Sequence, residues 1–162
     1  MSDADQLRRL LLERSVRRGD FVLTSGQRSS YYIDCRLSTM SAEGQVLIGR
    51  MGLAAIKAAG WRPRALGGLT MGADPVAYAI AAASWGTDLV IDAFSVRKEA
   101  KEYGMGQRIE GNFGPGDEVV VVEDVITSGG SAQKAIRRWR PLGVGSSECW
   151  RWWTGSRAVG RR

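Results

Sequence analysis

The sequence contains no histidine, and this absence excludes catalysis by a histidine base and metal sites built on imidazole. It has only two cysteines, Cys35 and Cys149, so no disulfide framework is expected and a reducing cytoplasm is the expected location. No apolar run reaches the length of a transmembrane helix, and the start of the chain is not that of a signal peptide. We therefore expect a cytoplasmic protein that does not bind membranes.

What is present is the composition of one globular domain, with 44% apolar and 25% charged residues in a chain of 162. The net charge of +6 is compatible with nucleic-acid binding, but its distribution opposes that interpretation. Residues 138–162 hold six arginines and one glutamate, which leaves 17 basic and 16 acidic residues in the rest of the chain. The basic character belongs to the C-terminal tail, and we expect no nucleic-acid partner.

The stretch from Val119 to Ser131 is the one around which the chain is organised. Its β-branched residues predict a strand buried on both faces, as in a parallel sheet. Glu123 and Asp124 end the strand, and a loop of Thr, Ser and Gly leads into a helix over residues 132–137. Such a loop lets a phosphate reach unpaired N–H groups at the helix N-terminus, and the two carboxylates suit sugar hydroxyls or a hydrated Mg²⁺. An ordinary strand–turn–helix is the alternative, but the paired acids favour a phosphate site.

This stretch matches neither Gly-x-Gly-x-x-Gly nor the P-loop, and it resembles the phosphoribosyl-pyrophosphate (PRPP) motif of type I phosphoribosyltransferases. The resemblance implies that Glu123 and Asp124 contact the ribose hydroxyls and that Asp124 takes part in catalysis. It makes both residues candidate ligands of a Mg²⁺ ion that binds with PRPP. It also implies that PRPP and its 5′-phosphate are held by the residues that follow: Val125, Ile126, Thr127, Ser128, Gly129, Gly130 and Ser131.

Two amphipathic helices are predicted before the first core strand. Leucines at helical spacing predict a first helix that Ser2 or Asp3 caps and Gly19 ends. Apolar residues at helical spacing predict a second helix over residues 41–59, which Gly60 stops.

Between these helices, residues 19–36 fit two short strands around a Ser-Gly turn. Their sequence resembles the N-terminal hood of orotate phosphoribosyltransferases. The resemblance implies that Tyr31 and Tyr32, together with Thr127, bind the pyrimidine. Thr24 stands where this family often has a lysine that contacts PRPP.

A short strand over residues 65–70 is followed by Met71, Gly72 and a helix that has Pro75 near its start. Gly72 permits close contact between the backbone and a pyrophosphate, although a plain strand-to-helix turn is an equal alternative without context. The loop resembles the one that binds the pyrophosphate side of PRPP in phosphoribosyltransferases, which implies that role for Met71 and Gly72.

A further strand over residues 89–96 runs into a charged stretch, 97–111, in which positions 104, 106 and 111 are glycine. These glycines favour a mobile loop, and a mobile cationic loop can close over a pyrophosphate leaving group and exclude water. The stretch resembles the catalytic loop of orotate phosphoribosyltransferases, which implies a homodimer with the loop shared across its interface. The resemblance assigns PRPP contacts to Arg97, Lys98, Lys101 and Tyr103. Tyr103 stands where the family usually has a histidine.

The tail, residues 138–162, has four of the six tryptophans and no clear period. The fold calls for a further strand there, but the sequence shows no convincing one. A surface that binds nucleic acid or membrane is one interpretation. We prefer the hypothesis of a shift of reading frame near residue 138. Read one base earlier, selected codons for residues 149–158 encode Val-Leu-Ala-Val-Val-Asp-Arg-Glu-Gln-Gly, a buried strand with the Asp-Arg-Glu segment that orotate phosphoribosyltransferases have there. The arginine of that segment binds the orotate carboxylate in the family.

Alternating strands and helices predict an α/β fold with a parallel sheet. The resemblance implies the type I phosphoribosyltransferase fold: a central, mostly parallel sheet flanked by helices over residues 1–137, with residues 1–36 in a small hood. It implies an orotate phosphoribosyltransferase that uses orotate, PRPP and Mg²⁺ in pyrimidine biosynthesis. Three alternatives stay open: a phosphoribosyltransferase for another base, an impaired PRPP-binding regulatory paralogue, and a nucleic-acid binder that acts through the tail.

Overall fold

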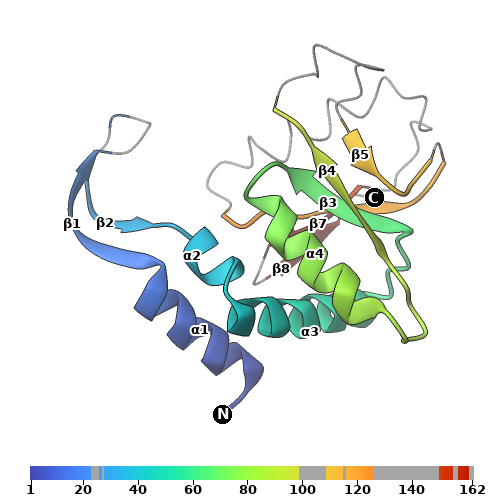
Figure 1. The fold of residues 1–162 in the computed structure, drawn as a ribbon, viewed down its shortest axis with the longest axis horizontal. Helices are drawn as coiled ribbons and strands as arrows, with labels where there is room; N and C mark the ends of the chain where they lie inside the picture. Colours follow the sequence, from blue (N-terminus) through green and yellow to red (C-terminus); the bar gives the residue numbers. More distant parts are fainter. Residues whose placement is uncertain are drawn as a thin grey trace.

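The computed structural model describes residues 1–22, 26, 28–98, 109–114, 116–125, 150–154 and 157–160, the last two ranges by their backbone alone (Figure 1). The first part of the chain contains α1 (Asp3–Arg14), β1 (Val16–Val22), β2 (Arg28–Ile33), α2 (Arg36–Thr39) and α3 (Ala42–Ala58). The second part contains β3 (Ala65–Leu69), α4 (Ala73–Ser84), β4 (Asp92–Val96), β5 (Ile109–Gly111), β6 (Val119–Val121), β7 (Trp150–Thr154) and β8 (Arg157–Gly160). No helix in the described part of the chain has the length and apolar character needed to cross a membrane.

The N-terminal hood consists of α1 and the antiparallel β1–β2 hairpin, which projects away from the sheet in Figure 1. Ser2 caps α1 through a capping box with Asp5, as its side-chain type predicts. The expectation that Gly19 ends this helix is wrong, because α1 ends at Arg14 and Gly19 lies inside β1. Pairing with β2 takes these residues into a strand, and the Asp34 N–H bonds the Ser15 carbonyl at 2.9 Å where the helix stops.

The body is built on a six-stranded sheet in the order β5-β4-β3-β6-β7-β8. The pairs β4–β3, β3–β6 and β6–β7 are parallel, as the alternation of strands and helices predicts. Both edge pairs, β4–β5 and β7–β8, are antiparallel and were not expected. In particular, residues 109–111 were expected to belong to a loop, but they form β5 because Ile109 pairs with Val96.

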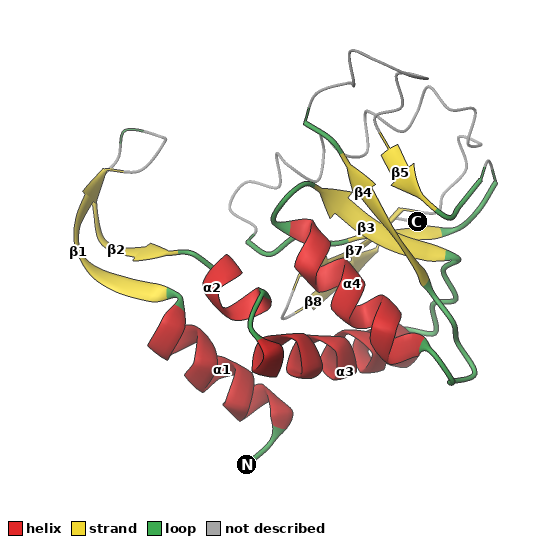
Figure 2. Cartoon of the chain, in the orientation of Figure 1, coloured by secondary structure: helices red, strands yellow, loops and turns green. Residues whose placement is uncertain are grey.

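Alternating residues of the central strands are buried on opposite faces of the sheet, as the β-branched run predicts. Leu66, Val120 and Val122 join the larger apolar cluster, which includes residues of α3 and α4. Ala65, Val119 and Val121 join the smaller cluster on the other face, together with Phe94 and Ile109 among others. Figure 2 shows α4 crossing in front of the sheet, with α3 below it.

The helix α3 begins and ends within one residue of the predicted range, 41–59. Ser41 caps α3 by accepting a hydrogen bond from the Gly44 N–H, and Gly60 follows the helix with a φ of 67°. The helices α3 and α4 pack closely because Gly49 and Gly52 have no side chain. A Cβ at Gly49 would meet the Ala79 carbonyl oxygen of α4.

The tail supplies the further strand that the fold calls for, although its sequence shows no convincing strand pattern. β7 pairs in parallel with β6, with Val119 opposite Trp150, and β8 turns back along β7. The physical reason is that β6 offers a free row of backbone N–H and C=O groups at this side of the sheet, which backbone pairing satisfies whatever the side chains. The predicted helix over residues 132–137 lies outside the described residues.

Candidate active site

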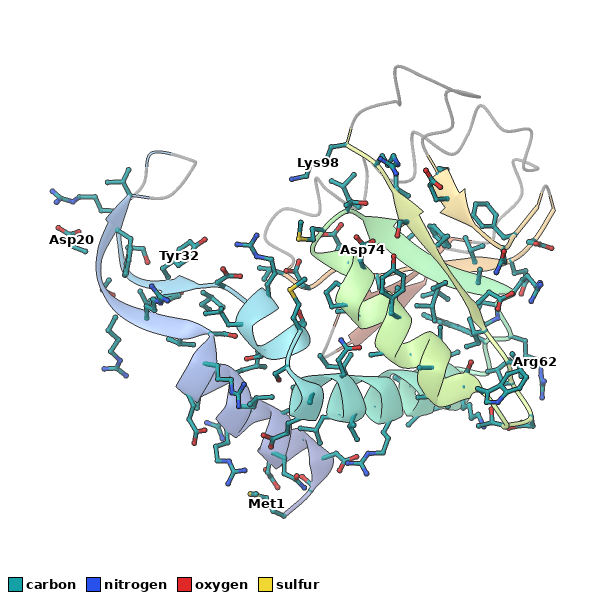
Figure 3. The ribbon with its side chains drawn as sticks, in the orientation of Figure 1. Met1, Asp20, Tyr32, Arg62, Asp74 and Lys98 are labelled. Carbon is teal, nitrogen blue, oxygen red and sulfur yellow. The ribbon has the colours of Figure 1, made fainter. Side chains whose placement is uncertain are left out.

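The carboxyl ends of β3, β4 and β6 meet at one edge of the sheet, because these three strands are parallel. Ligands bind at this edge in open α/β sheets. The segments that leave it are Thr70–Gly72 after β3, Arg97 and Lys98 after β4, and Glu123 and Asp124 after β6. In Figure 3, Lys98 lies beyond the end of β4 and Asp74 lies at the start of α4, near the same edge.

Two buried side-chain oxygens at this edge have no hydrogen-bond partner among the described residues: Glu123 Oε1 and Thr70 Oγ1. Burial raises the pKa of Glu123 from 4.5 to about 7, and the charge of Asp124 adds to the effect. Buried polar atoms normally have a partner, protein or water. The two oxygens therefore indicate a place that water or a polar ligand completes.

The loop after β3 touches the carboxylate after β6. A Cβ at Gly72 would overlap Asp124 Oδ1, so only glycine lets the loop backbone approach that carboxylate. Asp124 Oδ1 in turn accepts a hydrogen bond from the Val125 N–H at 2.9 Å. The predicted pyrophosphate loop and the predicted ribose-binding acid are therefore adjacent, although they are 52 positions apart in the sequence.

The predicted cationic loop begins and ends at an antiparallel strand pair. The chain leaves β4 after Val96 and returns at Ile109, which lies opposite Val96. Arg97 Nε donates a hydrogen bond to Glu110 Oε1 at 3.0 Å, and both side chains are partly exposed. The Thr70 N–H donates to the Val96 carbonyl at 2.9 Å, which joins the β3 loop to the end of β4. Arg97 and Lys98 thus leave the sheet next to Met71 and Gly72.

A cavity of about 460 Å³ opens beside the Met71 loop, between the hood and the body. Its lining residues are Arg14, Asp34, Arg36, Leu37, Met40, Ser41 and Met71. Arg36 forms two hydrogen bonds of 2.8 Å with Asp34, and these bonds hold the pKa of the Asp34 carboxyl below its usual value. Small-molecule sites have volumes of this order, with apolar walls and a few polar groups.

The cavity borders the two-carboxylate edge. Burial, together with the charges of Asp124 and Asp34, raises the pKa of the Cys35 thiol to about 11. The hydrogen bonds with Asp34 raise the pKa of Arg36, and the charge of Asp124 makes a smaller contribution. Such electrostatic coupling needs proximity, so Asp124 lies close to the segment that lines the cavity.

The hood tyrosines do not line this cavity. Tyr31 and Tyr32 are neighbours in β2 and therefore point to opposite faces of the hairpin. They are 54% and 43% exposed, and the Tyr32 ring lies 5.7 Å from the ring of Phe21. Figure 3 shows Tyr32 on the hairpin, apart from Asp74 and Lys98. The structure thus brings together the residues predicted for the PRPP side and leaves the two tyrosines on the hood.

Several predicted site residues lie outside the described part of the chain: Thr24, Lys101, Tyr103, Ile126, Thr127, Ser128, Gly129, Gly130 and Ser131. The roles that the resemblance assigns to them stay predictions. The described anchors of these segments, Lys98 before the cationic loop and Val125 before the phosphate loop, lie at the edge where those roles require them.

The residues at this edge fit a magnesium ion in their chemistry. Mg²⁺ takes oxygen ligands, usually one or two carboxylates together with substrate phosphates and water. Glu123 and Asp124 supply two carboxylates, and Glu123 Oε1 has no partner among the described residues. These two residues would hold the ion.

Sequence inspection missed three side chains that the structure places at the site. Glu110 pairs with Arg97 from the strand β5, which was not predicted. Asp34 and Arg36 form the charged wall of the cavity. Their spacing, two apart after the predicted hood strand, was a local signal of an ion pair, whereas nothing local in the sequence linked Glu110 to Arg97.

Comparison with known proteins agrees with this geometry. No protein-family model matches the chain. An orotate phosphoribosyltransferase from Rhodopirellula baltica is 45% identical over 139 residues, which are 83% of this chain and 72% of that protein. Two crystal structures of the Mycobacterium tuberculosis orotate phosphoribosyltransferase are similar. The complex with Fe(III) dicitrate has a TM-score of 0.75 and 41% identity over 88% of this chain and 78% of that one. The complex with PRPP has a TM-score of 0.69 and 38% identity over 89% and 78%.

The fold found in these structures is the mixed, mostly parallel sheet with flanking helices and a small N-terminal hairpin that the resemblance predicts. The predicted family is therefore confirmed by sequence relatives and by solved structures that each cover most of the chain. One edge of the sheet carries two neighbouring carboxylates, a glycine loop that touches one of them, and two cations at the end of β4. On its sequence relatives and structural matches, the chain belongs to the orotate phosphoribosyltransferase family.

Proposed function

We propose that this protein transfers the ribose 5-phosphate group of PRPP to orotate, giving orotidine 5′-phosphate and pyrophosphate in pyrimidine biosynthesis. The contact between Gly72 and Asp124 is the observation that carries the proposal. It places a backbone loop suited to a pyrophosphate beside a carboxylate suited to ribose hydroxyls, and these two groups adjoin one another in PRPP. Family membership supports orotate as the base.

The residues of this chain act by positioning and charge. The carboxylates of Glu123 and Asp124 accept hydrogen bonds from the ribose hydroxyls, while the Met71–Gly72 backbone faces the pyrophosphate. The bond from ribose C1 to pyrophosphate breaks, with its electron pair leaving on the pyrophosphate. A ring nitrogen of orotate bonds to C1, and the proton of that nitrogen passes to solvent. Arg97 and Lys98 neutralise the charge that develops on the leaving group.

A Mg²⁺ ion supplies further charge neutralisation at the phosphates when it is bound. Its candidate ligands in this chain are Glu123 and Asp124, with the remaining oxygens coming from PRPP and water. The cavity beside Met71 is our candidate for the orotate ring, because Leu37 and Met40 offer apolar contact next to the charged wall.

The assembly and location follow from the same proposal. The cationic loop leaves and re-enters the sheet at its edge, since β5 is the terminal strand. A loop at a sheet edge is accessible to a second copy of the chain, so we propose a homodimer that shares this loop. Two cysteines and no predicted disulfide fit a cytoplasmic enzyme.

Pyrophosphate release tests the proposal. The purified chain, PRPP and Mg²⁺ are incubated with orotate, uracil, adenine or hypoxanthine, and pyrophosphate is measured with a coupled assay. Release with orotate alone is expected. Release with another base instead of orotate would identify a different substrate. If none of the four bases gave release, the proposed activity would be contradicted.

A variant pair separates the site from the surface. Asp124→Asn removes the ribose-binding charge and is expected to lower kcat/KM for PRPP by about a hundredfold. Glu13→Gln is the control, because Glu13 is an exposed α1 residue that pairs only loosely with Arg9, at 3.9 Å. It is expected to leave kcat/KM unchanged.

A further inference from the structure

A chain of two hydrogen bonds joins α4 to β4 at the edge that carries the site. Ser95 Oγ of β4 donates to Asp74 Oδ1 in the first turn of α4, at 2.7 Å. The Tyr78 hydroxyl, one turn further along α4, lies 2.9 Å from Ser95 Oγ. Because the Ser95 proton is directed at the carboxylate, the Tyr78 O–H is the donor in the second bond.

This chain of hydrogen bonds lies between the two segments that flank the predicted pyrophosphate position. Asp74 follows Gly72 by two residues, and Ser95 precedes Arg97 by two residues. Gly72 is the residue that touches Asp124. Figure 3 shows Asp74 at the start of α4, on the side of the sheet edge where Lys98 leaves β4. A shift of the first turn of α4 relative to β4 would therefore move the loop away from both Asp124 and the cations.

Packing alone does not require these hydrogen bonds. The start of α4 is already fixed to the sheet by its apolar face, where Ala73, Val76 and Ala77 are buried. Ser95 and Asp74 are only partly buried, and Tyr78 is 51% exposed. A partly exposed hydrogen bond contributes little to the free energy of unfolding, so its value lies in where it holds Asp74.

The charge of Asp74 gives the interaction a second consequence. A carboxylate two residues beyond a pyrophosphate loop repels the phosphate charges, unless it is turned aside. The Ser95 hydroxyl holds the carboxylate against β4. Loss of the hydroxyl both loosens the loop and frees an anion beside the phosphates, and both effects weaken binding of the same ligand.

We propose that Ser95 and Asp74 are positioning residues for the pyrophosphate half of PRPP: the Ser95–Asp74 hydrogen bond fixes the Met71–Gly72 loop relative to Asp124 and Arg97. The inference rests on the proposed function for the identity of the ligand. It concerns binding of the pyrophosphate end, and it makes no claim on the base.

The test compares Ser95→Ala with Ser84→Ala. Ser84 lies at the other end of α4 and also ties that helix to the sheet, since its Oγ accepts from the Ile91 N–H at 2.9 Å and it is fully buried. Ser95→Ala is expected to raise KM for PRPP roughly tenfold, with kcat and KM for orotate changed less than about twofold, and to leave Tm nearly unchanged. Ser84→Ala is expected to lower Tm and leave KM for PRPP unchanged.

Two more variants sharpen the result. Ser95→Thr keeps the hydroxyl and is expected to keep the PRPP affinity, whereas Tyr78→Phe removes only the outer bond and is expected to raise KM for PRPP by less than about threefold. The proposal is overturned if Ser95→Ala leaves KM for PRPP within twofold of the unaltered chain. It is also overturned if Ser84→Ala raises that KM as much as Ser95→Ala does.

Direct binding separates this proposal from the proposed function. Calorimetry with inorganic pyrophosphate and Mg²⁺ needs no turnover and no base. If no base supports pyrophosphate release, but Ser95→Ala still weakens pyrophosphate binding about tenfold and Ser95→Thr does not, the function fails and the positioning role stands. Equal pyrophosphate affinity in all three proteins rejects the positioning role, whatever the activity.

Discussion

The hood and the body of this protein are held by different forces. In the body, every residue of β6 is buried, whereas in the hood β2 has no buried residue. The body is therefore specified by apolar burial, which is proportional to the area removed from water. Besides the packing of Leu7 of α1 against the larger apolar cluster, the hood is attached through a polar joint: Ser15 Oγ and Ser38 Oγ, both fully buried, lie 2.6 Å apart. A module with little core of its own can present side chains to a substrate, but it depends on its attachment.

Replacing valine by alanine in the body and in the hood tests whether the two regions are held by different forces. Val120→Ala removes two methyl groups from a residue of β6 that is 1% exposed, and we expect a loss of about 2.5 kcal/mol in the free energy of unfolding. Val22→Ala removes the same groups from a hood residue that is 72% exposed, and we expect a loss below about 1 kcal/mol. Chemical denaturation measures both. If the two losses in the free energy of unfolding were equal, the hairpin would have to be packed in solution against a partner that a single chain does not provide.

The C-terminal strands test whether a body strand needs an apolar sequence. β7 has the sequence Trp-Arg-Trp-Trp-Thr, and it lies where the shifted reading frame encodes Leu-Ala-Val-Val-Asp. A chain with Val-Leu-Ala-Val-Val-Asp-Arg-Glu-Gln-Gly at residues 149–158 is expected to melt about 5 °C higher, because apolar β-branched residues suit a strand inside a sheet. An unchanged Tm would contradict the expected loss of stability. DNA that encodes one uninterrupted, differently coded frame through residue 138 would contradict the frame-shift hypothesis.

These strands also show what the sequence does and does not predict. Ser2, Ser41 and Gly60 mark helix ends correctly, because capping depends on a few neighbouring residues. β6 is predicted because burial on both faces leaves a continuous apolar run. β5 and β7 are not, because each exists through pairing with a strand distant in the sequence, and such pairing leaves no local periodicity.

The candidate site divides in the same way. Glu123, Asp124 and Gly72 stand in short motifs, and the structure brings them to one edge. The hydrogen bond from Ser95 to Asp74 links residues 21 positions apart and of ordinary type, so neither residue carries a local signal. Predicting such a link requires the register of β4 against β3 and the start of α4, which only the folded chain supplies.

Breaking the polar joint between hood and body should give the next largest loss in the free energy of unfolding. Ser38→Ala leaves the buried Ser15 hydroxyl without its partner, and we expect a loss of about 1.5 kcal/mol in the free energy of unfolding. Ser29, a partly buried residue of β2 whose hydroxyl bonds the backbone of Tyr31 two residues away, gives the control Ser29→Ala, with an expected loss below about 0.5 kcal/mol. Denaturant titration measures both variants. If the two losses were equal, the polar joint would not be what attaches the hood.

The last effects are expected from two carboxyls whose pKa values shift in opposite directions, and they appear only as a dependence on pH. Burial in the body raises the pKa of Glu123 from 4.5 to about 7, so the folded state binds this proton more tightly than the unfolded state. Its contribution is present below pH 4.5 and is lost as the pH rises towards 7. Next to the hood, hydrogen bonds from Arg36 lower the pKa of Asp34 below 3.8, so its contribution is present above that pH and is lost on acidification.

Glu123→Gln should therefore become more stable than the unaltered chain between pH 4.5 and about 7, with a gain below about 2 kcal/mol because solvent screens a half-exposed group. Asp34→Asn should be less stable than the unaltered chain at pH 7, and that difference should shrink only below pH 3.8. Denaturant titrations across this pH range measure both differences. Parallel curves for Glu123→Gln and the unaltered chain would show that Glu123 titrates as an exposed carboxyl, and the body edge would then be as open to water as the hood.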